Sequence, residues 1–165
     1  MPLIRPSTHD QFIARYGGVY EASPWVAEAV FPAWQARGVD TADAMAAAMR
    51  TVVDAVPRER KQALIRAHPE LAGRTRMADA SVREQSGAGL DQCSPEEFEA
   101  FQRLNRAYNH RFGHPFIVAV KGMTRADILT AFEARLANDP ETEFAAAIEQ
   151  IHRIAGFRLA ELMSA

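Results

Sequence analysis

The chain contains a single segment with the character of a β-strand, and this feature most limits the folds open to it. Residues 115–120 (PFIVAV) are apolar and include the β-branched residues Ile117, Val118 and Val120, a composition that strands favour. The sequence offers no second run of matching character to pair with this one. We therefore expect a buried extended segment between helices, and no sheet.

Start and stop signals for helices recur along the rest of the chain, and the hydrophobic period is about 3.6 residues wherever it is clear. The strongest signal is the segment 94–97 (SPEE), a capping box with proline at the first helical position, whose helix should end at Gly113. Pro32 is expected to kink or end an earlier helix. Other helices are expected to begin near Ser7 or Thr8, Ser23, Asp40 or Thr41, Pro57 and Thr124, and after Asn138. We predict an all-α bundle of roughly eight helices in a single domain, residues 1–165.

Composition narrows the class of partner. The formal net charge is −2 and the Lys and Arg residues are scattered, so neither a nucleic-acid partner nor a membrane surface is expected. The single cysteine, Cys93, excludes an intramolecular disulfide and a multi-cysteine metal site. No secretory signal is recognised, and no apolar run approaches the roughly 20 residues that span a bilayer. We expect a cytoplasmic protein with a small-molecule or protein partner.

His68 is predicted to lie at the end of a helix. Pro69 disfavours the helical conformation of the residue before it, so the helix should stop there and leave the imidazole at its C-terminus. The negative end of the helix dipole favours the imidazolium form. The side chain could bond the last carbonyls of the helix. It could instead be a general acid–base group, for which an ordinary pKa near 6.5 suits neutral pH.

Polar side chains share one face of the helix predicted over residues 81–88. Ser81, Glu84, Gln85 and Ala88 have the spacing i, i+3, i+4, i+7, so a hydroxyl, a carboxylate and an amide should point the same way. Glu84 alone is typical of a solvated helix carboxylate. Together with His68 and Ser81 it becomes a candidate to orient the imidazole or to hold a proton.

Arg158 falls on the apolar stripe of the last helix, between Ile151 and Leu162. A guanidinium in that position needs an anionic partner. It could reach the surface or pair with a structural carboxylate. It could also clamp a carboxylate or a urea-like oxygen of a substrate.

For the other reactive side chains, the surrounding sequence gives less support to a functional role. His110 and His114 have a spacing that can bind a metal on a helix, but Gly113 and Pro115 surround His114, so the helix should end between them and no metal site is expected. Ser81 lacks the context of a nucleophilic serine. No motif supports a nucleophilic role for Cys93.

Taken together, these residues resemble the 2-oxo-4-hydroxy-4-carboxy-5-ureidoimidazoline (OHCU) decarboxylases of uric acid degradation. The likeness extends from the region of Ser23 to the last helix. Its most specific parts are residues 68–73 (HPELAG), 81–85 (SxxEQ), 101–108 (FxxLNxxY) and 111–117 (RFGHPFI).

The resemblance implies a decarboxylation that needs no cofactor and yields (S)-allantoin, in an all-helical fold often found as a homodimer. By position, it makes His68 and Glu84 the catalytic pair. The implied substrate contacts are Pro69, which shapes the pocket, the side chains of Ser81, Gln85 and Arg158, and main-chain groups around Phe116, Ile117 and Val118.

Two rival functions stay open on the sequence. One is another ureide-processing enzyme, such as a hydroxyisourate hydrolase-like activity. The other is a non-catalytic helical interaction module, in which the polar cluster is only a buried network. A metal-dependent enzyme is a third and weaker alternative.

Overall fold

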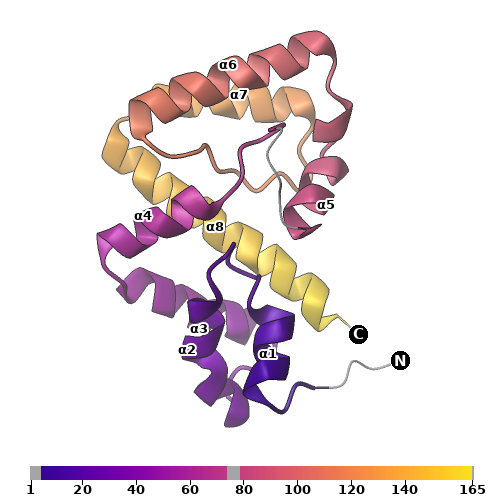
Figure 1. Cartoon of the computed structure of the whole chain (residues 1–165), viewed down its shortest axis with the longest axis vertical. Coiled ribbons are helices and arrows are strands. Elements are labelled where there is room, and N and C mark those ends of the chain that lie inside the picture. The colour runs from indigo at the N-terminus through magenta and orange to yellow at the C-terminus, as the bar shows by residue number, and fades with distance from the viewer. Residues whose placement is uncertain (1–4, 74–78, 165) are drawn as a thin grey trace. The chain divides into compact units, whose positions relative to one another are not determined.

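The computed structural model describes residues 5–73 and 79–164, and in this part of the chain helices are joined by loops without any β-strand (Figure 1). This confirms the all-α prediction. Part of the prediction that the N-terminus carries no secretory signal concerns residues 1–4, which lie outside the described residues. In chain order the elements are α1 (His9–Tyr16), α2 (Pro24–Gln35), α3 (Ala42–Ala55), α4 (Arg58–Ala67), α5 (Asp79–Gly87), the 3₁₀ helix η1 (Leu90–Gln92), α6 (Pro95–Phe112), α7 (Arg125–Leu136) and α8 (Pro140–Met163).

Side-chain caps set the beginnings of several helices. In α6 the Ser94 hydroxyl accepts from the Glu97 N–H at 3.1 Å, and the Glu97 carboxylate accepts from the Ser94 N–H at 3.0 Å. Gly113 ends this helix in the left-handed conformation, with φ of 75°, where a side chain would be strained. Capping boxes at Thr8 and Thr124 start α1 and α7. The predicted capping box and its glycine stop are confirmed.

Pro32 lies inside α2, and the helix continues past it to Gln35. A proline has no N–H to donate, so one backbone hydrogen bond of the helix is missing at this point. Of the two outcomes expected at Pro32, the end of the helix is therefore excluded.

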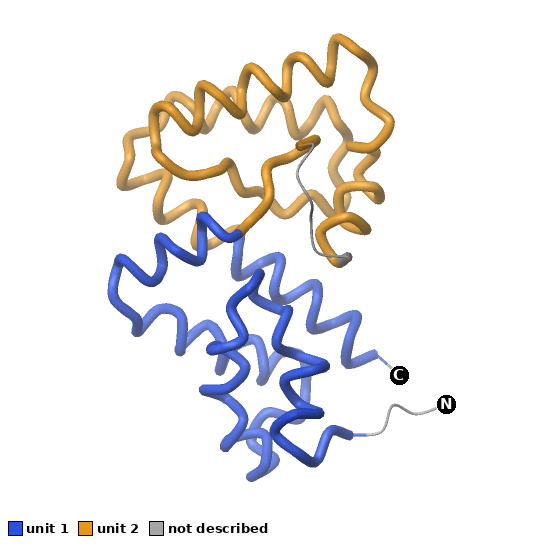
Figure 2. The backbone as a smooth tube through the Cα atoms, viewed as in Figure 1, with its two compact units in different colours: residues 1–67, 151–165 blue, residues 68–150 orange. Residues whose placement is uncertain are grey.

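Contacts divide the chain into two compact units (Figure 2). Unit 1 consists of residues 1–67 and 151–165, and unit 2 of residues 68–150. Helix α8 contributes residues to both. The expected single domain over residues 1–165 stays a prediction.

Each unit has its own apolar centre. In unit 1, α2 packs on α1 and α3, and the rings of Phe12, Tyr16 and Trp34 contact one another among buried side chains. In unit 2, α6 packs on α7 around a cluster that includes Phe101 and Phe132. Burial of such apolar surface is the main favourable contribution to folding.

The 115–120 segment contributes to the core of unit 2 and forms neither helix nor strand, in agreement with the predicted absence of a sheet. Phe116 is almost completely buried, and its ring stacks on Phe132 with 4.0 Å between centroids. The segment thus has a fixed place beside α6 and α7, because a stacked aromatic pair holds its position.

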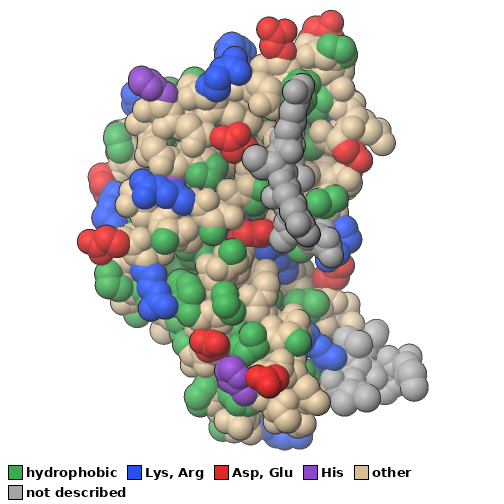
Figure 3. Space-filling view, in the orientation of Figure 1, with side chains coloured by type: hydrophobic (Ala, Val, Ile, Leu, Met, Phe, Trp, Pro, Cys, Tyr) green, Lys and Arg blue, Asp and Glu red, His purple; other side chains and the backbone are tan. Residues whose placement is uncertain are grey.

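Charged side chains of both signs are interspersed on the face shown in Figure 3. Among the described helices, none is both long enough and apolar enough to cross a membrane.

Candidate functional site

His68 is the first residue after α4, which ends at Ala67, as the following proline predicted. Its side chain is buried, with 8% of its surface exposed, and Pro69 beside it is half-buried. A histidine at a helix C-terminus lies near carbonyl groups that no longer have partners within the helix. The imidazole is therefore buried, and it lies near the negative end of the helix dipole.

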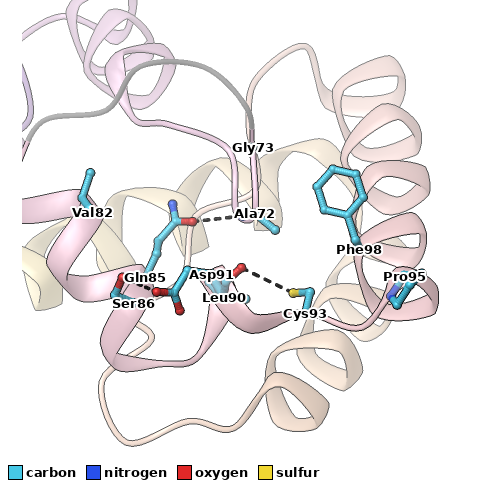
Figure 4. A pocket seen from close by; sticks show the side chains of 10 residues that line it. All are labelled: Ala72, Gly73, Val82, Gln85, Ser86, Leu90, Asp91, Cys93, Pro95 and Phe98. Atoms are coloured by element: carbon cyan, nitrogen blue, oxygen red, sulfur yellow. Dashed lines mark hydrogen bonds between the residues drawn. The ribbon is translucent and has the colours of Figure 1, made fainter.

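The loop that follows His68 is fixed by the amide of Gln85 on α5 (Figure 4). The Ala72 N–H donates to Gln85 Oε1 at 3.0 Å, and Gln85 Nε2 donates to the Glu70 carbonyl at 3.1 Å. Ala72 has φ of 52°, a strained conformation for alanine that persists only where surrounding contacts enforce it. Gln85 supplies two of those contacts.

A row of amide side chains on α6 holds the same loop from another side. Asn105 Nδ2 donates to the Leu71 carbonyl at 2.9 Å, and Gln102 Nε2 donates to the Ala72 carbonyl at 3.0 Å. Asn109 Nδ2 donates to the Glu70 carboxylate at 2.7 Å. Gln102 and Asn109 were not predicted from the sequence. Their i, i+3, i+7 spacing with Asn105, which places the three amides on one helix face, is the signal that could have identified them.

The polar residues on one face of α5 differ in how far they are buried. Ser81 and Gln85 are buried, whereas Glu84 is half-buried. Ser81 and Gln85 thus lie inside the protein, whereas part of Glu84 is accessible to water.

The backbone N–H groups of residues 116–118 are available as hydrogen-bond donors. Within the described chain, the N–H groups of Phe116, Ile117 and Val118 donate to no other residue. Phe116 and Ile117 are buried, and buried N–H groups are nearly always paired in folded proteins. These N–H groups are suited to carbonyl or carboxylate oxygens of a ligand.

The carbonyl side of the same segment is occupied by Arg135, which donates to the Ile117 carbonyl. Arg135 is paired in turn with Glu143, a fully buried carboxylate that also accepts from the Tyr108 hydroxyl at 2.6 Å and from Asn138 at 3.0 Å. Burial raises the pKa of Tyr108 far above its ordinary value, and the hydrogen bond to Glu143 raises it further. The phenol therefore stays protonated and donating. Sequence reasoning missed this network.

Arg158 lies in unit 1, whereas the other predicted site residues lie in unit 2. Its guanidinium is buried, ion-paired with Glu21 at 2.9 Å, and donates to the Gly18 carbonyl at 3.1 Å. The alternative in which Arg158 pairs with a carboxylate of the protein is thus confirmed. Its contact with substrate stays a prediction.

Unit 2 also has a pocket of about 480 Å³ on one side of α5 (Figure 4). Of the predicted site residues, Gln85 lines it, together with Val82 and Cys93. The Cys93 thiol donates to the Leu90 carbonyl at 3.5 Å. Burial raises its pKa, and the nearby Glu97 carboxylate raises it further, so little thiolate forms at neutral pH.

The two histidines with metal-binding spacing are separated by the end of α6. His110 is exposed on the helix, whereas His114 is buried and its Nδ1 lies 3.0 Å from the Pro115 carbonyl. The described residues contain no group of three or more His, Cys, Asp or Glu side chains arranged to hold a metal ion.

Comparison with known proteins identifies a family for the whole fold. The family model for OHCU decarboxylase matches residues 6–160. The 2-oxo-4-hydroxy-4-carboxy-5-ureidoimidazoline decarboxylase of Haloferax volcanii is 44% identical over 155 residues, covering 94% of this chain and 90% of that protein.

Two crystal structures are similar in fold. One, of (S)-allantoin synthase, matches with a TM-score of 0.75 and 34% identity, over 95% of this chain and 50% of that chain. The other, of OHCU decarboxylase in the presence of (S)-allantoin, matches with a TM-score of 0.65 and 25% identity, over 76% of this chain and 83% of that chain. With a family model that spans both units, the chain belongs to the OHCU decarboxylase family.

Proposed function

We propose that this protein decarboxylates OHCU to (S)-allantoin in uric acid degradation and that it needs no cofactor to do so. The observation that carries the proposal is the family match over residues 6–160. The placement of His68 supports it, because the imidazole is buried at a helix end beside a loop that Gln85 and Asn105 hold. We further propose a cytoplasmic location and a homodimer.

The substrate supplies its own electron sink, which explains why no cofactor is needed. Its carboxylate is on a carbon adjacent to a C=N bond. When the bond to the carboxylate breaks, carbon dioxide leaves and the electron pair passes into the conjugated imine, giving an enol-like intermediate. A proton is then added to one face of the former imine carbon, which carries the ureido group, while the enol hydroxyl loses its proton and becomes a ring carbonyl, so that one enantiomer of allantoin forms.

His68 and Glu84 are proposed to manage the protons of this reaction. His68 would interact with the ring hydroxyl or the substrate carboxylate, and Glu84 would hold or deliver the proton that fixes the stereochemistry. Positioned acid–base groups contribute on the order of 10²–10⁴-fold each in rate. The half-buried position of Glu84 supports its role, since the carboxylate must regain a proton after each turnover.

The remaining proposed contacts bind and orient the substrate. The N–H groups of residues 116–118 would donate to its ring and ureido oxygens. Pro69, Ser81, Gln85 and Arg158 would complete the site. Orientation by fixed donors is itself catalytic, because it replaces the reorganisation of water around the developing charge.

The first test follows product chirality. OHCU is generated from urate by the upstream enzymes, and allantoin is followed by circular dichroism with wild type, His68→Ala, or the control His110→Ala at an exposed histidine of α6. We expect a rapid one-handed signal with wild type and the control, and a rate on the order of 10²–10⁴-fold lower with His68→Ala.

Other outcomes separate the rival functions. A racemic product at the background rate with wild type would overturn the proposal and favour a non-catalytic module. Release of carbon dioxide from fresh OHCU is measured in parallel. Turnover of hydroxyisourate without such release would favour the other ureide enzyme.

A further inference from the structure

We propose that Arg135, held by Glu143, is a positioning residue that aims the Val118 N–H at an oxygen of the substrate. The inference rests on the proposed function and deepens it, because it explains how the chain keeps one of its main-chain donors directed at the ligand. It concerns residues of unit 2 alone.

The geometry of one peptide sets the direction of the Val118 N–H. The Ile117 carbonyl and the Val118 N–H belong to the same peptide group, which is trans, so they point in opposite directions across one plane. Arg135 Nη1 donates to that carbonyl. The hydrogen bond therefore turns the Val118 N–H away from Arg135, and this N–H donates to no other described residue.

Arg135 is itself held in one orientation. Its Nε donates to Glu143 Oε1 at 2.7 Å, and its Nη2 lies 2.6 Å from the same oxygen. Glu143 is itself fully buried and held by Tyr108 and Asn138. A planar guanidinium bound on one edge by a fixed carboxylate has little freedom to reorient its remaining N–H groups.

Arg135 holds two consecutive residues. Its guanidinium carbon lies 4.4 Å from the centre of the Phe116 ring, while Nη1 binds the carbonyl of Ile117. The cation–π contact and the hydrogen bond thus fix the segment immediately before Val118.

Arg135 also has an electronic effect on this peptide. A hydrogen bond from a cation to a carbonyl is roughly twice as strong as a neutral one. It draws electron density toward the carbonyl oxygen and makes the N–H of the same peptide a better donor. Arg135 therefore both directs and strengthens the Val118 donor without touching the substrate itself.

The test compares Arg135→Lys with Arg125→Lys. Arg125 is a matched control in unit 2, because it also bridges a glutamate, Glu97 at 3.0 Å, and a main-chain carbonyl, that of Gly89 at 3.0 Å. A lysine keeps the charge but cannot serve the carboxylate and the carbonyl with a planar fork. We expect KM for OHCU to rise about tenfold in Arg135→Lys with kcat changed less than about threefold, and no change of KM in Arg125→Lys.

A second readout reports on the donor directly. Amide hydrogen exchange is followed in wild type with and without (S)-allantoin, and we expect the ligand to protect the Val118 amide. The Ala119 N–H, which already donates to Gln150 at 2.9 Å, is the internal reference. In Arg135→Lys the protection of Val118 by the ligand should be lost while Ala119 keeps its slow exchange.

If Arg135→Lys does not fold, the neutral pair Arg135→Gln with Glu143→Gln replaces it, since it leaves no unpaired buried charge. An unchanged KM together with ligand protection of Val118 would overturn the inference and reduce Arg135 to a structural ion pair. A wild type that is active but shows no protection of Val118 would overturn it as well and leave the proposed function standing. A wild type without stereoselective decarboxylation would overturn both.

Discussion

Two arginines of this protein, the buried Arg158 and the half-buried Arg135, each neutralise a glutamate and bind a main-chain carbonyl. Arg158 pairs with Glu21 and donates to the Gly18 carbonyl in unit 1. Arg135 pairs with Glu143 and donates to the Ile117 carbonyl in unit 2. Because the guanidinium is a planar fork with five donors, one side chain can satisfy a carboxylate and still hold a loop.

The role of Arg158 can be tested apart from its effect on stability. In the double variant Arg158→Met with Glu21→Leu, an apolar pair replaces the buried ion pair, a change that is often neutral or stabilising. Loss of the donor to Gly18 costs about 1 kcal/mol. We therefore expect urea unfolding close to that of wild type, and loss of the one-handed allantoin signal because the proposed substrate contact is gone. Full activity in a stable double variant would show that Arg158 is only structural.

At the scale of the element, helix α6 connects stability with the site. Its N-terminus is fixed by the capping box at Ser94 and Glu97, while Gln102, Asn105 and Asn109 further along hold the loop after His68. A helix that begins at a defined residue places its later side chains at a defined angle and height. The cap therefore contributes to the position of the amides that grip the loop.

The capping box at Ser94 and Glu97 should make the stability of the fold depend on pH in the acid range. The hydrogen bond from the Ser94 N–H, and then that from Arg125, lower the pKa of Glu97 below its ordinary value of 4.5. A carboxylate with a lowered pKa adds stability at pH above that ordinary value, and the contribution is lost as the pH falls through the lowered pKa. We expect the difference in Tm between wild type and Glu97→Gln to be present at neutral pH and to shrink in acid.

Glu96→Gln is the matched control, because Glu96 is exposed in the same first turn and has no part in the capping box. A difference in Tm that is the same for both variants, or that does not depend on pH, would contradict the assigned role of Glu97. The measurement is thermal unfolding by circular dichroism across the acid range.

At the scale of the whole molecule, the family model spans both compact units, since it matches residues 6–160 and the units divide at residues 67 and 150. Helix α8 contributes to each unit. A ligand that binds only the folded protein should raise its Tm.

We expect (S)-allantoin, the proposed product, to raise Tm. The expected stabilisation is about 2.7 kcal/mol at a hundredfold excess of ligand over Kd. The (R) enantiomer is the control, and it should stabilise less because donors fixed on the backbone of residues 116–118 distinguish mirror images. Equal shifts with both enantiomers, measured by scanning calorimetry, would contradict a stereoselective site.

The helices and their caps were open to prediction from the sequence because they depend on residues a few positions apart. Ser94 meets Glu97 one turn later, and Pro69 acts on its neighbour His68. The absence of a sheet was predictable too, since the 115–120 segment has no partner of its own kind. The family was likewise recognised from short motifs, and the same motifs predict His68 and Glu84 as the catalytic pair.

Only the tertiary structure decided which distant groups meet. Gln85 and Asn105 bind the loop after His68, Arg135 binds the Ile117 carbonyl, and Arg158 pairs with Glu21. Many carboxylates and carbonyls in the chain could satisfy the same donors equally well, so no local pattern selects among them. The choice depends on how the helices pack, because packing determines which polar groups are buried together and must pair.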